Sequence, residues 1–130
     1  MKYTIDQYDA FLKSKLIERN KSQTQSSVVL SFWNDFCQFH MKYLDKPKLV
    51  SILFHDEIDC DHIDRSGVVD FLWRNSNHDH VELEIHPNSL VDWYVFLNKE
   101  KGQYLSIGSN DPVELTKEMC NTLFEYIGKL

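Results

Sequence analysis

Hydrophobic residues recur at two different intervals along the chain, and the change of interval predicts the fold. Between residues 5 and 44 the intervals are three and four, the period of an amphipathic helix. Between 69 and 107 the interval is two, the period of a strand with one buried face. The pattern predicts an α+β domain with two N-terminal helices, an antiparallel β-meander of about four strands and a C-terminal helix packed on one sheet face.

The first helix is predicted over about residues 5–19. Thr4 and Gln7 have the spacing of a capping box at its start. The stretch 20–27 is polar throughout, which predicts a loop between the first helix and the next.

The second helix is predicted over residues 28–44, with Ser26 or Ser27 as its N-cap. Pro47 prevents its continuation. Because large apolar residues recur at helical spacing, we expect this helix to be strongly buried; they are Val29, Phe32, Trp33, Phe36, Phe39 and Tyr43. Segment 49–54 fits either a short buried strand or a helical turn, and 55–66 is acidic and irregular.

The predicted meander has turns at residues 75–79, 87–89 and 98–102, and a short last strand at 104–107. One set of alternating positions should face the helices: Val69, Phe71, Trp73, Val81, Leu83, Ile85, Val91, Trp93 and Val95. The other set should point outward: Asp70, Leu72, Arg74, Glu82, Glu84, Asp92, Tyr94 and Phe96.

The closing helix has three agreeing start signals. Asp111 would be the N-cap, Pro112 would occupy the first helical position, and Glu114 would complete the capping box. An apolar stripe runs from Leu115 to Ile127, and Gly128 would end the helix.

Length and composition fit one globular domain that spans residues 1–130. The three cysteines form no CxxC pair, which argues against a disulfide framework and against a cysteine zinc site. There is no apolar run of membrane-spanning length and no signal-peptide core. We therefore expect a cytoplasmic protein without a cofactor and without a structural metal.

The net charge of −6 is unevenly distributed. Residues 45–92 contain eleven acids and four bases, a net charge of −7, whereas the other residues contain nine acids and ten bases. This distribution disfavours direct binding of nucleic acid, because phosphates would be repelled. It favours attraction of a basic partner protein.

Motifs for catalysis are absent from the sequence: we find no GxSxG, Walker A, GxGxxG or HExxH pattern. The run from His55 to Asp64 combines five acids and two histidines. A solvated acidic loop is one interpretation of this run, and a docking patch for a basic protein is another. A third is a divalent-metal site of a small hydrolase built from His55, Asp59, Asp61 and His62.

Two further clusters contain residue types that can carry chemistry. His78, Asp79 and His80 lie at a predicted hairpin tip and could bind a transition metal weakly. Cys37 and His40 are three residues apart on one helix, but inert packing is the stronger interpretation of a cysteine among aromatic residues.

The outward face of the meander is a further candidate interface. Leu72, Tyr94 and Phe96 would form an apolar spot among acids, a composition typical of protein interfaces. Coverage of this spot by the last strand or by 49–54 is the alternative. The predicted partner-binding residues are Asp56, Glu57, Asp59, Asp61, Asp64, Leu72, Glu82, Glu84, Asp92, Tyr94 and Phe96.

The segment 68–127 resembles small bacterial immunity proteins of contact-dependent and other polymorphic toxin systems. The resemblance is one of pattern, carried by the runs Asp70–Trp73, Val81–Ile85, Asp92–Val95, Gly102–Tyr104 and Asp111–Leu115. It implies a protein that binds a cognate toxin domain, often a nuclease, and blocks its active site. Phage-encoded inhibitors of bacterial defence enzymes share the same acidic profile.

The sequence therefore predicts a non-enzymatic inhibitor that binds a basic, nuclease-type toxin through an acidic surface. We expect it to be a monomer or weak dimer that binds neither nucleic acid nor membrane. The alternatives are a phage-encoded defence inhibitor, a small metal-dependent hydrolase and a module that associates with its own copy through the outward aromatic spot.

Overall fold

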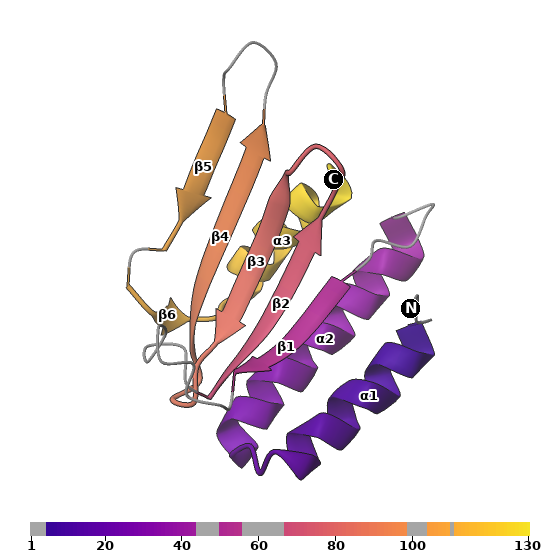
Figure 1. Ribbon diagram of the computed structural model, residues 1–130, viewed down its shortest axis with the longest axis vertical. Helices are drawn as coiled ribbons and strands as arrows, with labels where there is room; N and C mark the ends of the chain where they lie inside the picture. The colour runs from indigo at the N-terminus through magenta and orange to yellow at the C-terminus, as the bar shows by residue number, and fades with distance from the viewer. Residues whose placement is uncertain (1–4, 44–49, 56–66, 99–103, 110) are drawn as a thin grey trace.

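The computed structural model describes residues 5–43, 50–55, 67–98, 104–109 and 111–130. Three helices and six strands are formed within these ranges (Figure 1). The helices are α1 (Ile5–Glu18), α2 (Gln23–Tyr43) and α3 (Lys117–Gly128). The strands are β1 (Val50–His55), β2 (Val68–Arg74), β3 (His80–Ile85), β4 (Leu90–Asn98), β5 (Tyr104–Gly108) and β6 (Val113–Glu114). The predicted α+β class is confirmed, with five strands in the meander.

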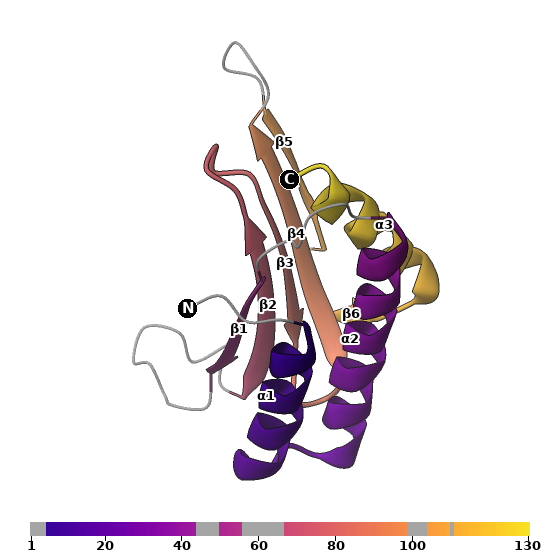
Figure 2. The ribbon, with the colours of Figure 1, turned by 90° about the vertical axis from the view of Figure 1, so that its right-hand side faces the viewer.

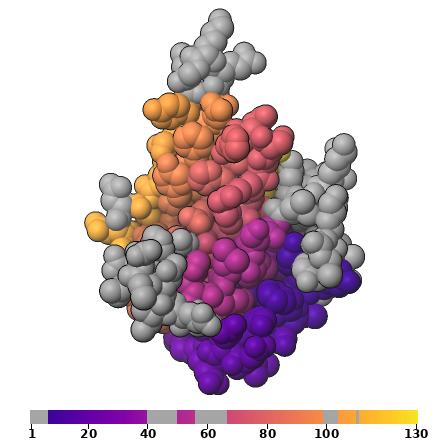
Figure 3. Space-filling model, viewed as in Figure 1, coloured from indigo at the N-terminus to yellow at the C-terminus, as the bar shows by residue number. Residues whose placement is uncertain are grey.

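The strands form one antiparallel sheet in the order β1-β2-β3-β4-β5, and β6 pairs with β4. Each of these five strands therefore pairs with its neighbour along the chain, and the connections from β2 to β3 and from β3 to β4 have the length of hairpin loops. Figure 2 shows the three helices on one side of the sheet. The opposite side, here called the outer face, is turned towards the viewer in Figures 1 and 3.

The core lies between the helices and the inner sheet face, where the predicted inward positions are buried. Aromatic rings of α2 connect the layers: the Phe32 ring centroid lies 5.3 Å from that of Phe71 on β2 and 5.6 Å from that of Phe124 on α3. Phe36 reaches Trp73 at 5.1 Å. Trp93 is the exception among the inward positions, because it is only half-buried at the margin of the core.

The start of α2 corrects the prediction of a loop over 20–27. The helix begins at Gln23, and Ser22, rather than Ser26 or Ser27, accepts a hydrogen bond at its side-chain oxygen from the Gln25 amide (3.1 Å). The side chain of Gln25 is 2% exposed and donates from Nε2 to the carbonyls of Gly67 (2.9 Å) and Ile85 (3.0 Å). The polar residue Gln25 can therefore lie in a buried part of the helix, because backbone carbonyls distant in sequence accept hydrogen bonds from its side-chain amide.

The start of α3 also differs from the prediction. Asp111, Pro112 and Glu114 do not begin the helix; Val113 and Glu114 form β6, opposite Val91 and Leu90 of β4. The helix begins at Lys117, where the Thr116 hydroxyl accepts from the Met119 amide (3.2 Å). Strand pairing therefore outcompetes a local capping signal in this segment.

The described part of the ambiguous segment 49–54, from Val50 onward, lies in the edge strand β1, whose Val50 is opposite Trp73. Tyr8 of α1 donates from its hydroxyl to the Val50 carbonyl (2.9 Å), which ties the first helix to this edge. Among the described helices, none is long and apolar enough to cross a membrane.

Candidate functional site

Three acidic residues form a row across the middle of the outer face. Glu84 on β3 lies directly opposite Asp70 on β2 and Asp92 on β4. In the next row Glu82 lies between Leu72 and Tyr94. Because residues on one face of a strand alternate, Glu82 and Glu84 point to the same side and complete an acidic cluster.

The members of the acidic cluster differ in burial. The sequence predicts that Asp70 points outward, and it lies on the outer face, between Leu53 of β1 and Glu84 of β3 in the register, but it is only 1% exposed. Glu82, Glu84 and Asp92 are half-buried. Their charges therefore remain accessible to a partner.

The carboxylates approach one another closely and are joined by histidines. One ligand-capable atom from each of Asp70, Glu82 and Glu84 lies within 4.8 Å of the others, and the same holds for Glu84, His86 and Asp92. His86 Nε2 is 2.7 Å from Asp92 Oδ2, and His55 Nε2 is 3.5 Å from Asp70 Oδ2. The two groups share Glu84, so carboxylates from three neighbouring strands are concentrated in this part of the face. A cation or a basic surface would complement their charge.

An aromatic row continues from the acidic cluster towards β5. The ring of Phe96 stacks on His80 (centroids 5.6 Å apart) and on Tyr104 (5.7 Å). His80 also lies 5.5 Å from Tyr94, which is 39% exposed and whose hydroxyl is 2.6 Å from Ser106 Oγ. These rings offer flat apolar surface beside the acids.

The predicted spot of Leu72, Tyr94 and Phe96 is therefore only partly contiguous. Tyr94 and Phe96 neighbour each other on β4, whereas Leu72 is half-buried on β2 and separated from Tyr94 by Glu82. In its described residues, β5 pairs at the edge of β4 rather than over its face. It contacts this spot through Tyr104, which stacks on Phe96, and through Ser106 at the Tyr94 hydroxyl.

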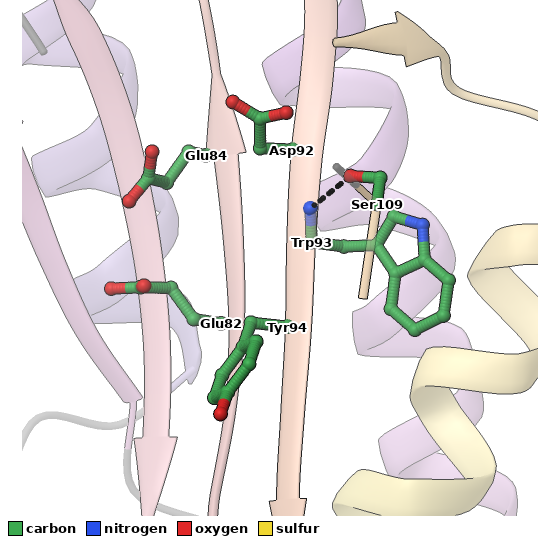
Figure 4. A pocket seen from close by; sticks show the side chains of 6 residues that line it. All are labelled: Glu82, Glu84, Asp92, Trp93, Tyr94 and Ser109. Carbon is green, nitrogen blue, oxygen red and sulfur yellow. Dashed lines mark hydrogen bonds between the residues drawn. The ribbon is translucent and has the colours of Figure 1, made fainter. Parts of the chain in front are cut away.

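A pocket of about 310 Å³ opens between the acidic cluster and the end of β5 (Figure 4). It is lined by Glu82, Glu84, Asp92, Trp93, Tyr94 and Ser109. Figure 4 shows the Trp93 indole turned towards α3, so that its backbone rather than its ring borders the pocket. The Ser109 hydroxyl accepts from the Trp93 amide (3.1 Å), and the Ser109 amide donates to the Trp93 carbonyl (3.1 Å).

Gly108 immediately precedes Ser109, which lines this pocket. A Cβ atom at this position would lie 2.6 Å from the Trp93 carbonyl oxygen and 3.2 Å from the Tyr94 ring. Only glycine therefore allows the end of β5 to approach β4 closely enough for Ser109 to form hydrogen bonds with Trp93.

The hairpin tip at His78, Asp79 and His80 is organised as a turn. The Asp79 carboxylate accepts from Asn75 Nδ2 (2.9 Å) and from the Asn98 amide, and these hydrogen bonds hold the pKa of Asp79 below its usual value. Both carboxylate oxygens thus accept hydrogen bonds that hold the turn. This structural role accounts for an aspartate at this position without invoking metal binding.

Several predicted residues lie outside the described parts of the chain. These are Asp56, Glu57, Asp59, Asp61 and Asp64 of the acidic loop, together with His62. Of the four residues in the proposed metal site of a hydrolase, only His55 lies in the described part of the chain, and it contacts Asp70. Cys37 is half-buried on α2, and the side chain of His40 is not described.

Four residues of the site were not assigned to it from the sequence: His80, which was considered only as part of a weak metal cluster at the hairpin tip, His86, Tyr104 and Ser109. His80 and Tyr104 occupy outward positions of their strands, and His86 directly follows β3. Extending the two-residue alternation slightly beyond the predicted strand ends would have identified all three. Ser109 left no such signal, because its role depends on contact with Trp93, sixteen residues earlier. Comparisons of the chain with protein-family models, with curated proteins and with solved structures yield no match.

Proposed function

We propose that this protein is an inhibitor that binds a basic protein through the outer face of its sheet, in the manner of a toxin-neutralising immunity protein. The observation that carries the proposal is the row of Asp70, Glu84 and Asp92, with Glu82 beside it, on the face opposite to the described helices.

Repulsion among the carboxylates of this row supports a role other than stabilising the fold. Like charges directly opposite each other on adjacent strands destabilise a sheet. Glu84 has a carboxylate opposite it on both neighbouring strands, and Glu82 stands two residues away on the same face. A binding partner of opposite charge explains why the fold keeps an arrangement that costs it stability.

The aromatic row supplies the second requirement of an interface. A few residues contribute most of the binding energy in a protein interface, and tyrosine is enriched among them. Charged residues around them provide orientation and rapid association. Tyr94 is 39% exposed and Tyr104 66% exposed, and Phe96 lies between them. A nuclease-type toxin fits this surface because its groove for phosphates is basic.

A growth experiment tests the proposal. The reading frames that flank the gene for this protein are expressed inducibly, each with and without it. A frame whose product arrests growth should be neutralised by the wild-type protein and not by the Glu84→Lys/Asp92→Lys variant. Glu125→Lys, an exposed position on α3, is the matched control and should neutralise fully. Neutralisation that survives both reversals on β3 and β4 would remove the outer face from the inhibitory interface.

The same surface suits a phage-encoded inhibitor of a bacterial defence enzyme. In that case neither flanking product is toxic, and the wild-type protein should instead raise phage yield on a host that carries the defence system. The Glu84→Lys/Asp92→Lys variant should lose this effect as well, because the acidic face is the common element.

Metal binding is a second candidate, favoured by the close approach of Glu84, His86 and Asp92. A histidine with two carboxylates is a common ligand set for divalent transition metals. Elemental analysis of protein purified without a histidine tag is the test: a stoichiometric metal lost in Glu84→Gln supports a metal-dependent activity, and its absence leaves the inhibitor proposal in place.

A further inference from the structure

The pocket between β3, β4 and the end of β5 has the chemistry of a receptor for one particular side chain. We infer that it takes an arginine side chain of the basic partner, held by Glu84, Asp92 and Glu82 and lying against the Tyr94 ring. The inference rests on the proposed function, since it names which group of the partner enters the acidic face.

The lining of the pocket favours a ligand rich in hydrogen-bond donors. Three carboxylates contribute acceptor oxygens from two strands, and Glu84 and Asp92 are directly opposite each other. His86 occupies one oxygen of Asp92 and so orients this carboxylate, while the Ser109 hydroxyl already accepts from the Trp93 amide. A cation with several N–H groups matches this set of acceptors.

Shape favours arginine over lysine. A guanidinium is planar, bonds carboxylates in a bidentate manner and stacks on aromatic rings, whereas an ammonium is a compact, strongly hydrated point charge. Figure 4 shows the Tyr94 side chain on the same face as the Glu82 and Glu84 carboxylates, where its ring borders the pocket. A pocket of about 310 Å³ also admits the side chain with part of its aliphatic stem.

Charge argues against a second copy of this chain as the occupant. The described residues of the outer face include four acids but a single strong base, Arg74. The acids are Asp70, Glu82, Glu84 and Asp92. Two such faces would repel each other at neutral pH. The complement of the pocket is therefore a protein of opposite charge.

Two peptides of equal length and charge test the inference, one with arginines spaced by glycines and the other with lysines in the same places. Both are titrated calorimetrically at low salt into the full chain. We expect the arginine peptide to bind about two- to fivefold more tightly, the ratio that stacking on an exposed aromatic ring provides.

Variants locate the effect. Glu84→Gln/Asp92→Asn, which preserves side-chain size, should weaken both peptides, whereas Glu125→Gln on α3 should weaken neither. Tyr94→Leu should abolish the preference for arginine and leave lysine-peptide affinity in place. Because Tyr94 is exposed, this variant leaves the core intact, and thermal unfolding of each variant verifies that it is folded.

The outcomes separate the inference from the proposed function. Equal affinity for the two peptides, weakened by Glu84→Gln/Asp92→Asn, would overturn arginine recognition while the acidic docking face stands. An arginine preference that persists in Tyr94→Leu, or that is unaffected by Glu84→Gln/Asp92→Asn, would place the site elsewhere on the chain. Failure of both peptides to bind the wild-type protein would contradict both proposals.

Discussion

Glu84 and Asp92 lie directly opposite each other on β3 and β4, with ligand-capable atoms of both within 4.8 Å. Two carboxylates in this relationship repel each other, and Asp70 on the other side of Glu84 adds to the repulsion. The sheet is held by its buried inner face despite this cost. Under the proposed function, the outer face is therefore the part of the molecule where binding and stability oppose each other.

Glu84→Gln should make this opposition measurable. Removing the central charge of the row is expected to raise the free energy of unfolding at neutral pH by about 0.5 kcal/mol, while affinity for a basic peptide falls. Urea denaturation gives the first quantity and calorimetry the second. Glu125→Gln, on an exposed position of α3, should change neither; a destabilised Glu84→Gln protein would mean that the carboxylate stabilises the fold.

Gln25 is a structural polar residue, and its replacement should be costly. Gln25→Leu leaves the Ile85 carbonyl, which accepts from Gln25 Nε2 at 3.0 Å, without this donor in a buried place. We expect a loss of about 2 kcal/mol in the free energy of unfolding. Gln38→Leu, at an exposed position of the same helix, serves as the control, and equal effects of the two changes would refute the role assigned to Gln25.

Gly108→Ala should damage both the sheet edge and the pocket. Its Cβ would lie 2.6 Å from the Trp93 carbonyl oxygen, so β5 must shift, at an expected cost of about 1–3 kcal/mol. Thermal unfolding measures the loss, and binding of the arginine peptide should weaken in parallel. Gly128→Ala, at the exposed end of α3, is the matched substitution and should be nearly neutral.

Asp79 predicts a particular dependence of stability on pH. Hydrogen bonds from Asn75 and from the Asn98 amide lower its pKa in the folded protein. Its stabilising contribution is therefore present above the pKa of the unfolded chain and is lost as pH falls through the folded value. Asp79→Asn should destabilise the protein at neutral pH and progressively less in acid, as followed by urea denaturation; Asp111→Asn, at an exposed position, should show no such trend.

Cys120 should resist modification while the protein is folded. Burial, with Asp35 acting in the same direction, raises its pKa to about 11, so at mildly alkaline pH the thiolate is roughly a hundredfold scarcer than for a free cysteine. Iodoacetamide labelling followed by peptide mapping measures this. The same residue in guanidinium chloride should label readily, and rapid labelling of the native protein would contradict the buried position.

Because the folded pKa is the higher one, the contribution of Cys120 to stability is complete below the unfolded pKa and is lost as pH rises towards 11.

The fold class and the sheet face on which the acids of the outer face lie could both be predicted from the amino-acid pattern. Successive side chains of a strand point to opposite sides, which is a local property of the backbone, so period two sufficed to place Glu82, Glu84 and Asp92 together with Tyr94 and Phe96. The same reasoning placed the inward positions, most of which are fully buried.

The neighbours of each side chain and the boundaries of the elements follow from long-range contacts. Glu84 stands between Asp70 and Asp92 because of strand order and register, which depend on pairing between segments distant in sequence. Gln25 belongs to α2 because backbone carbonyls 42 and 60 residues away accept its side chain, and Val113 belongs to β6 because Val91 pairs with it. Local signals define the direction of a side chain, whereas its neighbours are selected by contacts that no local pattern contains.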